Sequence, residues 1–204
     1  MHLIPTQEEV IELLTKTGAL RKGHYEYSNG LHADEFLQPA LALRHYQTAR
    51  TLGVGLSRKL RANHEIRAII PQLSVVAPAT AGLPVAYAVC EALRAHQVYW
   101  AEKANETDAL RFRQYVDVQP GEQVLMVDDI LRTGRRLTEL KKLVEARGGT
   151  VVGVAVMVYQ PNPKIADFSP LPLYYLAELE ATYYKDASSC ELCKQGVPVE
   201  KVEI

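Results

Sequence analysis

The chain has 204 residues, 48% of them hydrophobic and 23% charged, which suits one compact domain with its own core. Its 23 basic and 24 acidic residues give a net charge of −1, so the chain lacks the basic excess of a nucleic-acid-binding protein. No apolar run approaches the roughly 20 residues needed to span a bilayer. Its 3 cysteines are too few for a disulfide framework in a chain of this length.

The N-terminal sequence also lacks the basic flank and apolar stretch of a signal peptide. We therefore expect a cytoplasmic protein, without a membrane or nucleic-acid partner.

The N-terminal segment predicts a helix followed by a small hairpin. Thr6 and Glu9 have the spacing of a capping box, and apolar residues at helical spacing follow them. Further on, Tyr25 and Tyr27 alternate with polar residues, and residues 28–30 (Ser-Asn-Gly) are typical of a hairpin turn.

Helical and extended segments then alternate along the chain. Helical periodicity covers residues 46–60, 83–93 and 137–146, and short apolar runs predict strands at 73–77, 98–101, 124–127 and 151–158. Such alternation predicts an α/β fold with a central, mostly parallel sheet flanked by helices. The polar stretch 105–121 is predicted to be a mobile loop, with or without a hairpin.

The most informative window is residues 124–137. Four apolar residues end in Asp128 and Asp129, a short loop with Thr133 and Gly134 follows, and then a helix begins. Ligands of parallel sheets gather at the carboxyl ends of the strands, and a helix N-terminus presents free N–H groups to a phosphate. The carboxylates suit sugar hydroxyls or a hydrated Mg²⁺. We interpret the window as a phosphate-binding strand–loop–helix; the alternative is an ordinary turn followed by a solvated, arginine-rich helix face.

This window resembles the 5-phosphoribosyl 1-diphosphate (PRPP) motif of type I phosphoribosyltransferases: an apolar strand, two acidic residues and a Thr-Gly loop. Further segments resemble the orotate phosphoribosyltransferase branch, in the same order along the chain. They are a hairpin at 23–32, a diphosphate loop at 78–84, a catalytic segment at 101–113 and a tail at 190–198.

The resemblance implies a single domain over residues 1–204, with residues 1–45 forming a hood and 185–204 a C-terminal tail. It implies Mg²⁺-dependent transfer of phosphoribose from PRPP to a nitrogenous base, orotate or a related pyrimidine-like base, with release of pyrophosphate. In this family the closing loop reaches the neighbouring subunit's site, so the resemblance also implies a homodimer.

It further implies roles for individual residues. The PRPP-binding residues would be Ala79, Thr80, Ala81, Gly82, Asp128, Asp129, Arg132, Thr133, Gly134, Arg135 and Arg136. The catalytic residues would be Lys103, Arg111, Arg113, Asp128 and Asp129. The residues facing the base would be Tyr25, Tyr27, Asn29 and Phe36. The two tyrosines are equally well explained as core residues, and Phe36 is better explained as a core residue than as a ring stacked on the base.

The sequence departs from the family pattern at three places. Arg132 stands where the family usually has Thr, and Arg135-Arg136 where it often has Gly-Ser. Tyr159-Gln160 occupies the position of an Asp-Arg pair whose Arg binds the carboxylate of orotate. The catalytic segment also lacks a Lys-x-His-Gly element. These departures leave open a second hypothesis, a non-catalytic regulator that binds PRPP or a nucleotide on the same fold.

Cys190 and Cys193 form a Cys-x-x-Cys pair in the tail. Such a pair supplies two ligands of a zinc site that needs four, and no His lies nearby in the sequence. A zinc shared across a dimer and a redox pair both remain open. Cys90, inside an apolar helix, is most simply a buried small hydrophobe.

Overall fold

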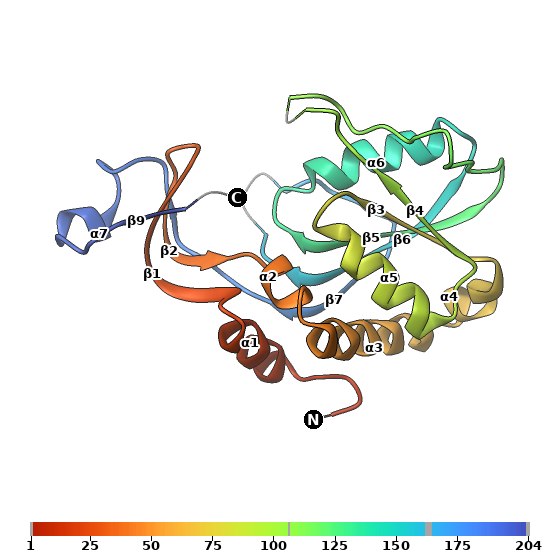
Figure 1. Ribbon diagram of the computed structural model, residues 1–204, viewed down its shortest axis with the longest axis horizontal. Helices are drawn as coiled ribbons and strands as arrows, with labels where there is room; N and C mark the ends of the chain where they lie inside the picture. The colour runs from red at the N-terminus through yellow and green to blue at the C-terminus, as the bar shows by residue number, and fades with distance from the viewer. Residues whose placement is uncertain (1, 106, 162–164, 203–204) are drawn as a thin grey trace.

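A five-stranded parallel sheet forms the centre of the computed structural model, which describes residues 2–105, 107–161 and 165–202 (Figure 1). The strand order is β4-β3-β5-β6-β7, and all neighbouring strands run parallel. The strands are β3 (Ser74–Pro78), β4 (Gln97–Ala101), β5 (Gln123–Leu131), β6 (Thr150–Tyr159) and β7 (Leu173–Glu178). The predicted parallel α/β sheet is thereby confirmed.

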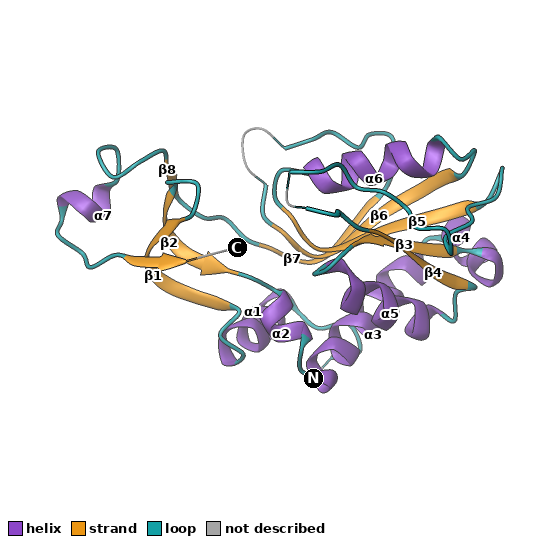
Figure 2. Cartoon of the chain, turned by 45° about the horizontal axis from the view of Figure 1, so that its top comes forward, coloured by secondary structure: helices purple, strands orange, loops and turns teal. Residues whose placement is uncertain are grey.

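Helices cover both faces of this sheet (Figure 2). α3 (Tyr46–Ala62) and α5 (Gly82–Leu93) pack on one face, and α6 (Arg135–Glu145) on the other. Successive side chains of a strand point to opposite faces. Accordingly, Leu125 and Val127 of β5 join the core under α3 and α5, whereas Val124 and Met126 join the core under α6.

The hood is a separate four-stranded sheet with the order β8-β2-β1-β9. Its hairpin is formed by β1 (Leu20–Tyr27) and β2 (His32–Leu37), which follow α1 (Gln7–Lys16) and its capping box. The C-terminal segment supplies β8 (Tyr183–Tyr184) and β9 (Glu200–Val202), which pair with β2 and β1. The two ends of the chain therefore build the hood together.

Four short helical segments complete the description. They are α2 (Ala40–Leu43), α4 (His64–Ile69), the 3-10 helix η1 (Ile70–Gln72) and α7 (Glu191–Lys194). Among the described helices there is none with the length and apolar character needed to cross a membrane.

Strand β5 is longer than the apolar run that predicted it. The prediction ended the strand at Val127, yet pairing with β6 continues through Asp128 and Ile130 to Leu131. Backbone pairing does not require apolar side chains, so the acidic pair lies inside the strand.

Candidate functional site

The loop between β5 and α6 lies at the carboxyl end of the central sheet, where parallel sheets bind ligands. Gly134 caps α6 with φ +77°, a conformation that favours glycine, and no side chain caps the helix. The first N–H groups of a helix lack intrahelical partners, so this end favours an anion. Leu137, Leu140 and Val144 of α6 are buried and anchor the helix against the sheet.

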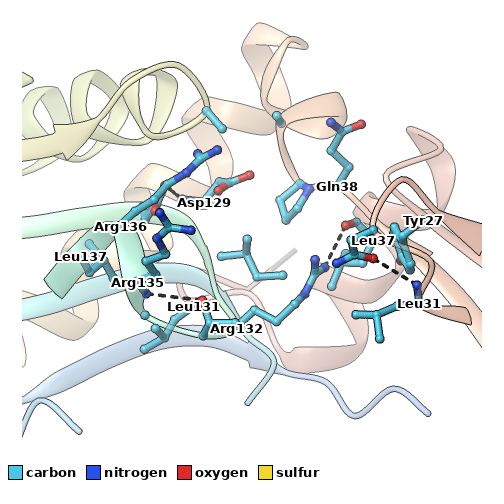
Figure 3. Close-up of a pocket in the computed structure, with 18 of the residues that line it drawn as sticks. Tyr27, Leu31, Leu37, Gln38, Asp129, Leu131, Arg132, Arg135, Arg136 and Leu137 are labelled. Carbon is cyan, nitrogen blue, oxygen red and sulfur yellow. Dashed lines mark hydrogen bonds between the residues drawn. The ribbon is translucent and has the colours of Figure 1, made fainter. Parts of the chain in front are cut away.

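This loop borders a cavity of about 470 Å³ between the central sheet and the hood (Figure 3). The hood side contributes Tyr27, Ser28, Asn29, Leu31, Leu37, Gln38, Pro39 and Ala40. The sheet side contributes Ala81 and residues 128–137. The sheet side of the cavity therefore carries three arginines and the acidic pair. The hood side carries apolar side chains and the amides of Asn29 and Gln38.

Asp128 and Asp129 are only 4% and 5% exposed. Burial raises the pKa of both carboxyls, and for Asp128 the neighbouring charge of Asp129 raises the pKa further. The positive charge of Arg136 acts in the opposite direction on both pKa values. Burial therefore disfavours the ionised form of both carboxyls in the ligand-free protein. A bound cation, or hydrogen bonds donated by sugar hydroxyls, would stabilise the ionised form.

The predicted diphosphate loop adjoins this acidic pair. Gly82 begins α5, and a Cβ at that position would lie 3.1 Å from Asp128 Oδ1 and 3.0 Å from the Ala77 Cβ. Only glycine permits this approach without displacing a neighbour. Of the predicted loop residues, Ala81 lines the cavity; Ala79 donates from its N–H to the Ala101 carbonyl at 2.7 Å, which ties the loop to β4.

Arg132 turns away from the other two arginines of the loop. In Figure 3 its side chain reaches across to Leu37, while Arg135 and Arg136 lie near Leu137 and Asp129. Its Nη2 donates to the Leu37 carbonyl at 3.1 Å, and its Nε donates to Gln160 Oε1 at 2.9 Å. The structure therefore brings Arg135 and Arg136, but not the Arg132 guanidinium, to the start of α6.

Gln160 links Arg132 to a carboxylate that the sequence analysis did not single out. The Gln160 amide donates to Glu35 Oε1 at 2.6 Å, and its oxygen also accepts from the Tyr183 hydroxyl at 3.0 Å. Glu35 is 2% exposed and forms an ion pair with Lys22. The sequence held one signal for Glu35, which is an acidic residue directly before the apolar Phe36 in a predicted extended segment. Its partner Gln160 lies 125 residues away, so sequence reasoning could not pair the two.

The residues predicted to face the base separate into two groups. Tyr27 and Asn29 line the cavity. Tyr25 and Phe36 are described but lie outside the cavity lining; they pack on each other in the hood core, with ring centroids 5.8 Å apart. The Tyr27 hydroxyl donates to the Glu35 carbonyl at 3.0 Å, which leaves the ring as the group available to the cavity.

The predicted catalytic segment lies beside α6 and does not contribute to the cavity lining among the described residues. Arg111 and Arg113 are exposed; Arg111 pairs with Glu102 through its backbone, and the Arg113 guanidinium forms an ion pair with the Glu102 carboxylate. Lys103 is half-buried. Leu110, Phe112, Val116 and Val118 are buried against the α6 face, so four apolar anchors hold the predicted loop.

Comparison with known proteins shows the family of the chain. The phosphoribosyl transferase domain family matches residues 56–169. The chain is 33% identical over 195 residues to an orotate phosphoribosyltransferase of Desulforamulus reducens, covering 96% of this chain and 95% of that protein. It is 34% identical over 194 residues to an orotate phosphoribosyltransferase of Thermus thermophilus, covering 95% of this chain and 100% of that one.

A solved structure is similar as well. It is the Mycobacterium tuberculosis H37Rv orotate phosphoribosyltransferase in complex with inorganic phosphate, at 25% identity and a TM-score of 0.64. The match covers 85% of this chain and 95% of that chain.

Proposed function

Because this chain belongs to the phosphoribosyltransferase family, we propose that it transfers phosphoribose from PRPP to a planar, pyrimidine-like base bearing a carboxylate, with orotate as the first candidate. The observation that carries the choice of base is the position of Arg132, which lines the cavity. Its guanidinium is held between Leu37 of the hood and Gln160, which follows β6 of the central sheet.

The start of α6 is the proposed site of the 5′-phosphate. The N–H groups after Gly134, the Thr133 hydroxyl and the Arg135 and Arg136 side chains meet there, and each is a donor suited to a phosphate. In the ligand-free protein the Arg135 N–H donates to the Thr133 hydroxyl oxygen at 3.4 Å, a long bond that a phosphate could replace. Asp128 and Asp129 would accept hydrogen bonds from the ribose hydroxyls, and residues 79–82 would contact the diphosphate. Holding both reactants in one cavity supplies the proximity on which such a displacement depends.

Arg132 is the proposed carboxylate partner of the base. Its two hydrogen bonds to Gln160 and Leu37 use two of the five N–H donors of a guanidinium. A carboxylate on the base can accept hydrogen bonds from the remaining N–H groups of the guanidinium, whose planar geometry suits bidentate pairing. Arg132 would thereby replace the arginine that the family resemblance expects at position 160, and we assign it to the base rather than to the phosphate of PRPP.

Mg²⁺ is the proposed cofactor. Two buried carboxylates with raised pKa values, without a third acidic partner around them in the described residues, fit a cation that arrives with its own oxygen ligands rather than one held in an all-protein cage. Asp128 and Asp129 would hold its waters, and the ion would neutralise charge on the departing pyrophosphate.

Pyrophosphate release, measured with PRPP, Mg²⁺ and either orotate or uracil, tests the proposal. The wild type should use orotate and discriminate against uracil, which lacks the carboxylate. Arg132→Ala should lower kcat/KM for orotate by about 30-fold or more, because a buried carboxylate loses its charged partner. Arg136→Ala is the matched control, since it should weaken PRPP binding to the same extent with either base.

Two results would contradict the proposal. Equal use of orotate and uracil by the wild type would remove the role of Arg132 in choosing the base. Calorimetric binding of PRPP without pyrophosphate release from any base in a broad panel would favour the non-catalytic regulator instead.

A further inference from the structure

Four side chains that are potential zinc ligands converge at the far end of the hood. His24 lies on β1, His32 on β2, Cys190 immediately before α7, and Cys193 within α7. Their ligand atoms all lie within 4.8 Å of one another. The hairpin and the tail, which meet here, are separated by more than 150 residues in sequence. None of the four lines the cavity, so the cluster is distinct from the proposed active site.

The spacing of these atoms fits tetrahedral coordination. The Cys190 and Cys193 sulfurs lie 3.5 and 3.6 Å from His24 Nε2, and the Cys193 sulfur lies 3.5 Å from His32 Nδ1. With Zn–S of about 2.3 Å and Zn–N of about 2.0 Å, a tetrahedral site separates sulfur from nitrogen by about 3.5 Å. The two nitrogens are 2.8 Å apart, so they would separate by about half an ångström around a metal.

The protonation of His24 is also suited to a ligand. Its Nδ1 lies 2.8 Å from the Val197 carbonyl oxygen, which only accepts hydrogen bonds, so Nδ1 carries the proton. Nε2 therefore directs its lone pair toward the two sulfurs and His32. A metal-bound histidine is commonly oriented in this way, by donating its other ring N–H to a carbonyl.

Burial explains why the cluster favours an ion. Cys190 is fully buried, and His24 and His32 are each 4% exposed. Two thiolates there are costly without a counter-charge, whereas Zn²⁺ with two thiolates and two neutral imidazoles has no net charge. Four protein ligands leave no position for a substrate, which is the arrangement of a structural site.

We propose that the protein binds one structural Zn²⁺ per chain through His24, His32, Cys190 and Cys193, joining the hood hairpin to the C-terminal tail. Among its described residues, the hood has five buried apolar residues in its own cluster, namely Tyr25, Tyr27, Ala33, Phe36 and Val202. A sheet with so small a core gains the most from a metal cross-link. Figure 2 shows α7 beyond β1 and β2, at the end of the molecule remote from the central sheet.

The test is the metal content of the full chain, purified without a histidine tag or chelator. Elemental analysis should find about one zinc per chain, and Co²⁺ exchanged into the wild type should show the strong visible bands of tetrahedral thiolate coordination. Cys193→Ser and His32→Gln should each lower the retained zinc by about tenfold or more. Cys90→Ser, the remaining cysteine, is the matched control and should retain the full amount.

Other outcomes would overturn the assignment. About half a zinc per chain would indicate a site shared between two chains. Zinc-free protein that fails to bind added Zn²⁺, with a disulfide between Cys190 and Cys193, would indicate a redox pair. Free thiols and no Zn²⁺ uptake would show that the cluster is only a hydrogen-bonded histidine pair. If the variants fail to fold, the metal content and Co²⁺ spectrum of the wild type decide alone.

Discussion

Gln160 shows how a neutral side chain can replace an expected arginine without leaving a charge unpaired. Glu35 is buried, so it requires partners; Lys22 supplies the charge, and Gln160 supplies a second hydrogen bond. The other end of the same amide accepts from Arg132. Gln160 therefore fixes the position of the guanidinium that we assign to the base.

Replacing Gln160 with Leu removes these bonds while keeping a similar volume. Glu35 and Arg132 then lose partners in a buried setting, so we expect the free energy of unfolding to fall by about 2–3 kcal/mol. The KM for the base should rise more than the KM for PRPP, because Arg132 loses its orientation. Urea denaturation and steady-state kinetics measure the two effects. The exposed Gln114→Leu serves as control, and an unchanged KM for the base would separate Gln160 from base binding.

The acidic pair illustrates a conflict between stability and function. The pKa of Asp128 is raised by burial and by Asp129, so the folded protein holds its proton more tightly than the unfolded chain. Above the ordinary pKa of 3.8, the unfolded state releases that proton first, and the free energy of unfolding falls as pH rises toward the native pKa. Each unit of difference corresponds to about 1.4 kcal/mol.

Asp128→Asn should therefore stabilise the ligand-free protein while weakening the binding of PRPP with Mg²⁺. The stability gain should be absent below the ordinary pKa, grow as pH rises above 3.8, and become constant above the raised native pKa. Thermal or chemical unfolding at a series of pH values measures this gain, and calorimetry measures the binding. A variant that is less stable than the wild type at pH 7 would refute this account of Asp128.

At the scale of elements, the junction of β5 and α6 depends on one glycine. Gly134 has φ +77°, and a Cβ there would lie 2.8 Å from the Ala166 Cβ and 3.0 Å from the Phe168 ring. The positive φ lets the chain turn from the loop into α6, whose first residues line the cavity. The segment around Phe168 closes the other side of the turn, so the glycine serves both the helix cap and the packing.

Gly134→Ala should cost about 2–3 kcal/mol of stability, because the side chain adds both φ strain and a clash. Gly18→Ala is the matched control: its φ is +72°, but a Cβ there meets nothing within 4 Å, so only about 1 kcal/mol is expected. PRPP binding should weaken only in the Gly134 variant. Equal losses in the two proteins would mean that the packing against Ala166 and Phe168 contributes nothing.

At the scale of the whole molecule, we propose a dimer in which the predicted catalytic segment of each chain reaches the cavity of the other chain. Lys103, Arg111 and Arg113 do not line the cavity of their own chain in the part of the molecule described. The segment that carries them lies on the α6 side and is anchored there by buried apolar residues. If these three side chains bind pyrophosphate, the simplest arrangement is that the segment of one chain reaches the cavity of the other chain in the dimer.

Mixing two inactive variants tests this arrangement. Lys103→Ala removes the proposed loop cation, and Asp128→Asn combined with Asp129→Asn disables the cavity. If the loop acts across a symmetric dimer, randomly mixed chains place one intact site in each hybrid, and activity should return to about a quarter of the wild-type value. Either variant mixed with itself is the control. No recovery, although hybrids form, would mean that the loop acts within its own chain.

Local sequence predicted the core of the fold and indicated where the candidate site lies. Helical segments that alternate with short, continuous apolar runs predicted the parallel sheet. The runs are continuous because a parallel sheet is buried on both faces. Thr6 and Glu9 predicted the start of α1 through their capping box, which the structure contains. The acidic pair and the Thr133-Gly134 turn indicated a phosphate-binding edge, since backbone donors at a helix start depend only on local geometry.

Only the tertiary structure decided which distant residues meet. Glu35 and Gln160 are paired across 125 positions, and the ligand atoms of His24 and Cys190 approach across 166. Arg132 turns toward the hood, although its neighbours Arg135 and Arg136 remain at the helix start. Periodicity and capping record interactions within a few residues. The contacts named here depend on how the hood lies against the carboxyl end of the central sheet and on how the two ends of the chain meet within the hood.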